Sequence, residues 1–133
     1  TKKQSEDLLD TLGVRQAAKR AQLLFIANGL PAELTRLATD ETRFLQRAQY
    51  IKDARSYITG SFYNKLRIAY EYKDNRAGAL ILLSDAMRLL RMSINKTNET
   101  TTLRHINRLE QISTRIVEQG NIRLQLSTGV SVV

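Results

Sequence analysis

The stretch AGALILLSDAMRLLRMSI, residues 77–94, is apolar around most of the circumference of a helix. A helix of that kind is usually the central helix of a bundle, with neighbours packed on several sides. Alternatively, part of its surface is free to bind a partner or a second subunit. The chain has one proline, Pro31, and six glycines, fewer turn residues than a strand-rich fold would need. The sequence therefore predicts an all-α fold organised around residues 77–94.

Apolar residues recur with helical spacing along the rest of the chain, separated by short turn signals. Ser5 is expected to cap the first helix at its N-terminus and Gly13 to end it. Phe62, Leu66 and Tyr70 mark the apolar residues of a later helix. We expect helices at about residues 6–12, 14–27, 31–38, 41–59, 62–73, 77–94, 103–119 and 122–128.

The last of these helices has an ambiguous pattern, because the segment EQGNIRLQLSTGV alternates apolar and polar residues as a strand does. Asn121 is a good N-cap, and in a helix Ile122 and Leu126 would share a face. We therefore predict a short helix that Gly129 ends early. Whether it faces its own bundle or a neighbouring subunit is open. The candidate interface residues are Asn121, Ile122, Leu124 and Leu126.

Three short helices precede Thr39 and Asp40, and longer helices follow. This change in length predicts a small three-helix subdomain at residues 1–39 and a helical bundle at residues 40–133. The first residue is Thr1 and not methionine, so we expect a fragment of a longer protein.

The formal net charge is +8, from 21 basic and 13 acidic residues. Such a chain can bind nucleic acid or an acidic partner through its summed field. The basic residues are spread along the whole length without a cluster that includes aromatic residues, so a solvated basic surface is favoured. The candidate nucleic-acid contacts are Arg104, Arg108 and Arg115.

The residue types that carry catalysis are sparse. No GxxxxGK[ST] or GxGxxG motif is present, there is no cysteine, and His105 is the one histidine. His105 is a possible general base, but the polar side of an amphipathic helix is the favoured interpretation. The five tyrosines could stack bases, although tyrosines at the edge of a core are favoured. We expect no enzyme activity, no cofactor and no metal.

Membrane insertion is not expected, because no apolar run reaches the roughly 18 residues that span a bilayer. The N-terminus is polar and charged, unlike a signal peptide. A cytoplasmic location follows as an expectation.

The segment AQLLFIANGLPAELTRLATDE, residues 21–41, is similar to the AAA+ lid of bacterial clamp-loader subunits. In that family a helix ends in a Gly-x-Pro turn, which Gly29 and Pro31 match here. Lids of ATP-hydrolysing subunits carry an arginine in this turn, in a Gly-Ser-x-Arg pattern, which this chain lacks. Delta-prime-like lids more often read Gly-Ser-Pro-Gly, from which the chain departs at Leu30 and Ala32.

The segment RLEQISTRIVEQGNIRLQLSTGV, residues 108–130, is similar to the end of the clamp-loader collar, where a long helix leads through an Asn-containing turn into a last helix. Ser127 stands where an acid is frequent, and Gly129 where leucine is common. The order of lid and collar agrees with the boundary placed near Asp40. The chain thus resembles the delta-prime-like subunits of the bacterial DNA polymerase III clamp loader.

This resemblance implies a scaffold and not an enzyme. The collar would join loader subunits into a hetero-oligomer through the C-terminal helices, and the full protein would help load the sliding clamp on primed DNA. DNA would be contacted only indirectly, through the complex. The alternative is a stand-alone helical module that binds nucleic acid or another protein.

Overall fold

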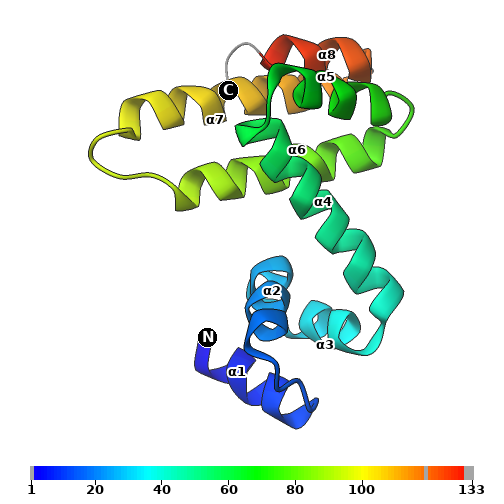
Figure 1. Cartoon of the computed structure of the whole chain (residues 1–133), viewed down its shortest axis with the longest axis vertical. Helices are drawn as coiled ribbons and strands as arrows, with labels where there is room; N and C mark the ends of the chain where they lie inside the picture. The colour runs from blue at the N-terminus through cyan, green and yellow to red at the C-terminus, as the bar shows by residue number, and fades with distance from the viewer. Residues whose placement is uncertain (1, 119, 131–133) are drawn as a thin grey trace. The chain divides into compact units, whose positions relative to one another are not determined.

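The computed structural model describes residues 2–118 and 120–130, and all regular secondary structure in those ranges is α-helical (Figure 1). The predicted all-α fold is therefore confirmed. In chain order the helices are α1 (Lys2–Thr11), α2 (Ala17–Ala27), α3 (Pro31–Thr39), α4 (Glu41–Thr59), α5 (Phe62–Glu71), α6 (Arg76–Met92), α7 (Glu99–Val117) and α8 (Ile122–Val130).

The chain divides into two compact units, an N-terminal unit of Thr1–Gln49 and a C-terminal unit of Tyr50–Val133. The division falls inside α4, ten residues beyond the expected boundary at residue 39. The first turns of α4 belong to the N-terminal unit, where Phe44 is buried and the Lys19 ammonium lies 5.5 Å from its ring centroid. Arg43, in the same turns, forms an ion pair with Glu33 of α3 at 3.1 Å.

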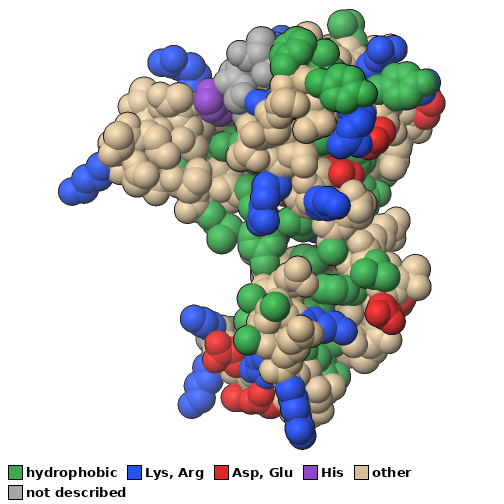
Figure 2. All heavy atoms as spheres, viewed as in Figure 1, with side chains coloured by type: hydrophobic (Ala, Val, Ile, Leu, Met, Phe, Trp, Pro, Cys, Tyr) green, Lys and Arg blue, Asp and Glu red, His purple; other side chains and the backbone are tan. Residues whose placement is uncertain are grey.

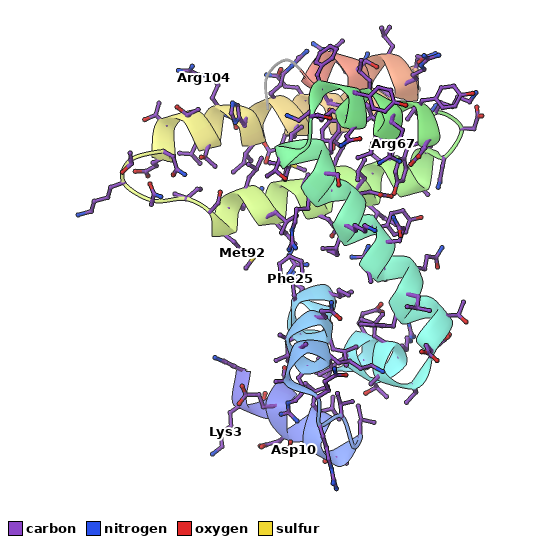
Figure 3. All side chains as sticks on the ribbon, in the orientation of Figure 1. Lys3, Asp10, Phe25, Arg67, Met92 and Arg104 are labelled. Atoms are coloured by element: carbon purple, nitrogen blue, oxygen red, sulfur yellow. The ribbon has the colours of Figure 1, made fainter. Side chains whose placement is uncertain are left out.

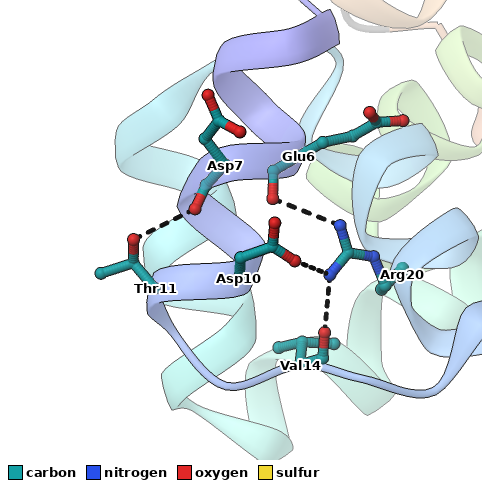
Figure 4. A network of polar contacts seen from close by, with 6 residues as sticks. All are labelled: Glu6, Asp7, Asp10, Thr11, Val14 and Arg20. Carbon is teal, nitrogen blue, oxygen red and sulfur yellow. Dashed lines mark hydrogen bonds and ion pairs between the residues drawn. The ribbon is translucent and has the colours of Figure 1, made fainter.

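The N-terminal unit packs α2 and α1 against α3. Arg20 of α2 ties α1 to the turn that follows it (Figure 4). Its Nη1 donates to Asp10 Oδ1 at 2.6 Å and to the Val14 carbonyl at 2.9 Å, and its Nη2 donates to the Glu6 carbonyl at 3.2 Å. One guanidinium thus satisfies two carbonyls as well as a carboxylate. The buried apolar residues of the unit are Leu9, Leu23, Ile26, Ala27, Leu34, Leu37 and Phe44.

Gly13 ends α1 as predicted. It has a φ of +78°, its N–H donates to the Asp10 carbonyl, and the Val14 N–H donates to the Leu9 carbonyl. This pair of bonds is the Schellman motif, which favours glycine at the left-handed position. The predicted N-cap was wrong, because α1 begins at Lys2 and Ser5 lies buried inside it. Good helix formers before Ser5 extend the helix by one turn.

Two other helices begin at residues different from those expected. α2 begins at Ala17, three residues after the predicted start, because Val14 belongs to the Schellman motif. α7 begins at Glu99, four residues before Leu103. Its first turn is closed by the Thr102 N–H, which donates to the Asn98 carbonyl at 2.8 Å.

α6 is a core helix of the C-terminal unit, which agrees with the mostly apolar pattern of this segment. α7 packs along α6, and α8 packs on both α5 and α7 (Figure 1). Most large apolar residues of α6 lie in or against the core, although Met92 at its last turn is exposed. The buried core residues that α6 supplies are Ala79, Leu82, Leu83, Ala86 and Leu90.

A buried hydrogen bond joins α4 to the residue after α5. Tyr72 Oη donates to Asp53 Oδ2 at 2.7 Å, and both residues are buried. Burial raises the pKa of Tyr72, and the hydrogen bond to Asp53 raises that pKa further. The phenol therefore remains a donor that partly compensates the burial of a carboxylate.

The end of α7 and the start of α8 form the predicted helix–turn–helix. The Gly120 N–H donates to the Arg115 carbonyl at 2.8 Å, and a Cβ on Gly120 would lie only 2.5 Å from that oxygen. Asn121 Oδ1 accepts from the Leu124 N–H at 2.8 Å, which is the predicted N-cap. Arg76 donates to the Ile116 carbonyl and so satisfies a carbonyl at the C-terminus of α7.

The prediction that Gly129 ends α8 was wrong, because the helix continues to Val130. Gly129 lies buried where α8 meets α4 and α7. A Cβ there would lie 2.3 Å from Tyr57 Oη and 2.7 Å from Ile112 Cδ1. Glycine at this position therefore allows close packing of α8 against Tyr57 and Ile112, and it does not stop the helix. With a helix end at Gly129, residues 130–133 were expected to be frayed or docked. Val130 belongs to α8, and residues 131–133 lie outside the described part of the chain.

Tyr57 links α4 to α8, because its buried hydroxyl donates to the Leu126 carbonyl at 2.7 Å. Replacing Tyr57→Phe removes this bond while keeping the ring. We expect the C-terminal unit to lose about 1 kcal/mol of unfolding free energy. The loss should appear in urea unfolding and as faster amide hydrogen exchange in α8. Tyr63→Phe, at a highly exposed position, is the matched control and should leave both unchanged; equal behaviour of the two variants would contradict the role given to Tyr57.

Candidate interaction surface

Several large apolar side chains of the C-terminal unit are exposed together on α5 and α8. Phe62 is 66% exposed, Tyr63 is 73% exposed and Leu124 is 60% exposed. The two helices pack side by side, and Figure 2 shows hydrophobic side chains gathered over them. We call this set the α5–α8 surface. It consists of Phe62, Tyr63, Leu66, Tyr70 and Leu124.

This surface exists because α5 carries apolar residues on two sides, and only one of those sides packs against the core. Ile68 and Ala69 face the core and are fully buried. Phe62, Leu66 and Tyr70 follow one another at intervals of four residues and remain exposed. The start of α5 is fixed by Ser61, whose Oγ accepts from the Asn64 N–H at 3.2 Å. The exposed residues are thus carried by a capped helix docked on the core.

Cationic side chains surround Tyr70. The Lys73 ammonium lies 4.2 Å from the Tyr70 ring centroid, and the Arg123 guanidinium carbon, from α8, lies 5.1 Å from it. Both distances are within the range of cation–π attraction. Arg67, labelled in Figure 3, forms an ion pair one turn along α5 with Glu71 at 2.5 Å. Glu71 in α5 and Asp74, next to Lys73 in the turn that follows, are the acids of these segments, against the cations Arg67, Lys73 and Arg123. The edge of the surface therefore carries a small excess of positive charge.

The structure separates the four candidate interface residues of the tail. Ile122 and Leu126 are buried in the core of their own unit. Leu124 points away from that core and is exposed, and Asn121 serves as the N-cap. Of the three apolar side chains, Leu124 is the one available to a partner. A role for these residues in an interface stays a prediction.

The turn that resembles a lid lies between α2 and α3. Asn28 and Gly29 both have positive φ, 51° and +79°, and Pro31 occupies the first turn of α3. Asn28, Gly29, Leu30 and Pro31 are exposed and carry no charge. Arg36 is a turn of helix away from Pro31, in the last turn of α3. The turn thus has no cation of its own for a phosphate group.

The three candidate arginines for nucleic acid lie along α7. Arg104 and Arg115 are exposed, while Arg108 is half-buried and donates to Gln111 Oε1 at 3.4 Å. Arg115 lines a shallow polar depression together with Glu110 and Glu118. Glu110 and Glu118 make this end of α7 mixed in charge. Contact with nucleic acid stays a prediction for all three arginines.

His105 lies half-buried on α7. Its pKa is lowered from the ordinary value of 6.5, first by burial and then by the nearby cations Arg104 and Lys65. Burial also lowers the pKa of Lys65. These surroundings favour the neutral imidazole. Within the described ranges, no group of three or more His, Cys, Asp or Glu residues could hold a metal ion, and no helix there is long and apolar enough to cross a membrane.

The sequence did not predict that the residues of the α5–α8 surface would be exposed together. Its helical spacing marked Phe62, Leu66 and Tyr70 as apolar residues of this helix, without a prediction of which side would be buried. The signal that could have separated them is a second apolar set on the same helix, formed by Ile68, Ala69 and the following Tyr72, which are the residues that the core buries. The tyrosines divide similarly, since Tyr57 and Tyr72 are buried while Tyr63 and Tyr70 are exposed.

No protein-family model matches the chain, and neither the curated proteins nor the solved structures give a significant match.

The lowered pKa of His105 gives a pH dependence with a defined sign. Between the folded pKa and the unfolded value near 6.5, the unfolded chain binds more protons, so the unfolding free energy falls as the pH drops through this window. His105→Gln removes that contribution. We expect the urea midpoint of the parent to fall more than that of the variant between about pH 7.5 and about pH 5. Parallel pH profiles for the two proteins would contradict this expectation.

Proposed function

We propose that this chain is the lid and collar region of a delta-prime-like clamp-loader subunit, a non-catalytic module that assembles with other loader subunits. The parent protein would then act in the cytoplasm, where the loader places the sliding clamp on primed DNA. No cofactor or metal is needed for this role. DNA would be reached through the assembled complex.

The α5–α8 surface is the observation that carries the proposal. The C-terminal unit already has an extensive core without these residues, and α5 is held by Ile68 and Ala69. Contiguous exposed apolar residues bordered by polar ones are typical of protein interaction sites. Exposed aromatic residues with arginine at the edge match the composition of interface centres. An assembly role explains why these side chains are left exposed.

The arrangement of the helices is compatible with the resemblance. Residues 21–41 form most of α2, the Gly29–Pro31 turn and α3. Residues 108–130 form the second half of α7, the turn capped by Asn121 and α8. Each resembling segment therefore corresponds to a complete helix–turn–helix junction, which is the structural unit that the resemblance implies.

A nucleic-acid-binding module is the second candidate, favoured by the net charge of +8 and by the exposed Tyr63 and Tyr70 near cations. Stacking of bases on aromatic rings would use such residues. The surface also exposes the aliphatic Leu66 and Leu124, which offer no ring for stacking. Its aliphatic content favours a protein partner.

The proposal predicts a stable complex with the matching gamma-type collar. We expect a mixture of the two at micromolar concentrations to elute from gel filtration as a larger species, with its mass measured by light scattering. Separate elution would count against the proposal. Binding to an oligonucleotide with a steep salt dependence, in the absence of collar association, would favour the second candidate.

A further inference from the structure

We infer that the α5–α8 surface binds an apolar helical segment with acidic flanks, supplied by a different subunit and not by a second copy of this chain. This inference rests on the proposed function and adds which surface is used and what chemistry the partner presents.

The apolar part of the surface fits a helix. Phe62, Leu66 and Tyr70 recur every four residues, so they extend over about 12 Å of the α5 axis. Leu124 adds an exposed apolar side chain from α8, the helix whose Arg123 contacts the Tyr70 ring. A partner helix that presents apolar residues at intervals of three and four would meet this length with about two turns.

The charged part of the surface selects the partner. Lys73 and Arg123 reach the Tyr70 ring from two different elements, so the packing of α8 on α5 assembles this cationic edge. Glu71 is paired with Arg67, which leaves Asp74 against Lys73 and Arg123, so the edge stays positive. The whole C-terminal unit has 13 basic and 7 acidic residues. Carboxylates on the partner would complement this edge and increase the rate of association.

The same charges disfavour a symmetric dimer through this surface. In a two-fold interface the same patch lies on both subunits. Lys73 and Arg123 of one copy would then face a second unit that is itself basic, with 13 basic and 7 acidic residues. Like charges brought together in this way oppose association. A partner with acidic residues avoids this repulsion and still covers Phe62 and Tyr63.

The test compares two altered surfaces with two matched controls, using the gamma-type collar as the probe. One variant combines Phe62→Ser with Tyr63→Ser, and the other combines Lys73→Glu with Arg123→Glu. The controls are Met92→Ser, a similarly exposed apolar residue on α6, and Lys96→Glu, an exposed cation in the loop before α7. All of these side chains are exposed, so circular dichroism should show that every variant is folded. Thermal unfolding should change little, apart from a small loss where Lys73 and Arg123 no longer contact the Tyr70 ring.

We expect each double variant to weaken binding at least about tenfold, as for residues central to an interface. The controls should stay within about twofold, since single exposed residues outside an interface contribute little. Salt should weaken binding of the parent more than binding of the Lys73→Glu/Arg123→Glu variant, because the parent uses opposite charges.

Other outcomes overturn the inference in distinguishable ways. A parent chain that binds no collar removes both this inference and the proposed function. If the parent binds the collar and neither double variant weakens that binding, this inference fails while the proposed function stands. The same holds if Phe62→Ser/Tyr63→Ser weakens binding and Lys73→Glu/Arg123→Glu does not. Self-association of the parent that Phe62→Ser/Tyr63→Ser abolishes would identify a second copy as the occupant. Oligonucleotide binding lost in that variant, with collar binding intact, would identify nucleic acid.

Discussion

Burial of α6 is the constraint on which the C-terminal unit depends. Leu82, Leu83 and Ala86 are fully buried near the middle of this helix, and α7 packs along it. Removing such side chains from water is the main favourable contribution to folding. With α6 and α7 held together, Ile112 and Ile116 of α7 join the same core that α8 completes with Ile122 and Leu126.

Close packing of α8 follows from that core and determines what remains exposed. Gly129 permits contact with Tyr57 and Ile112, and the Tyr57 hydroxyl binds the Leu126 carbonyl. Once α8 is docked in this way, Leu124 points outward and Arg123 reaches Tyr70 on α5. The α5–α8 surface is therefore a consequence of how the core closes, with the apolar and cationic residues brought together from separate segments.

This arrangement bears on the kind of function the chain is suited to. The pKa values of the buried tyrosines Tyr57 and Tyr72 are raised by burial, and both hydroxyls serve as structural donors. His105 lies near cations that lower its pKa. The two tyrosines thus have structural roles, whereas Phe62, Tyr63 and Leu124 are exposed and lie outside the core of their own unit. That contrast is the observation on which the proposed assembly with a partner rests.

The sequence alone determined the helical class, the contribution of residues 77–94 to the core and the turn capped by Asn121, because these depend on local spacing and on side chains close in the chain. The tertiary structure decided matters that depend on distant residues. Gly129 allows close packing because Tyr57 and Ile112 lie against it, and no local pattern distinguishes that from a helix stop. The exposure of Phe62, Leu66 and Tyr70 was likewise decided by which side of α5 met the core, since a helix with two apolar sides can bury either one until its neighbours are in place.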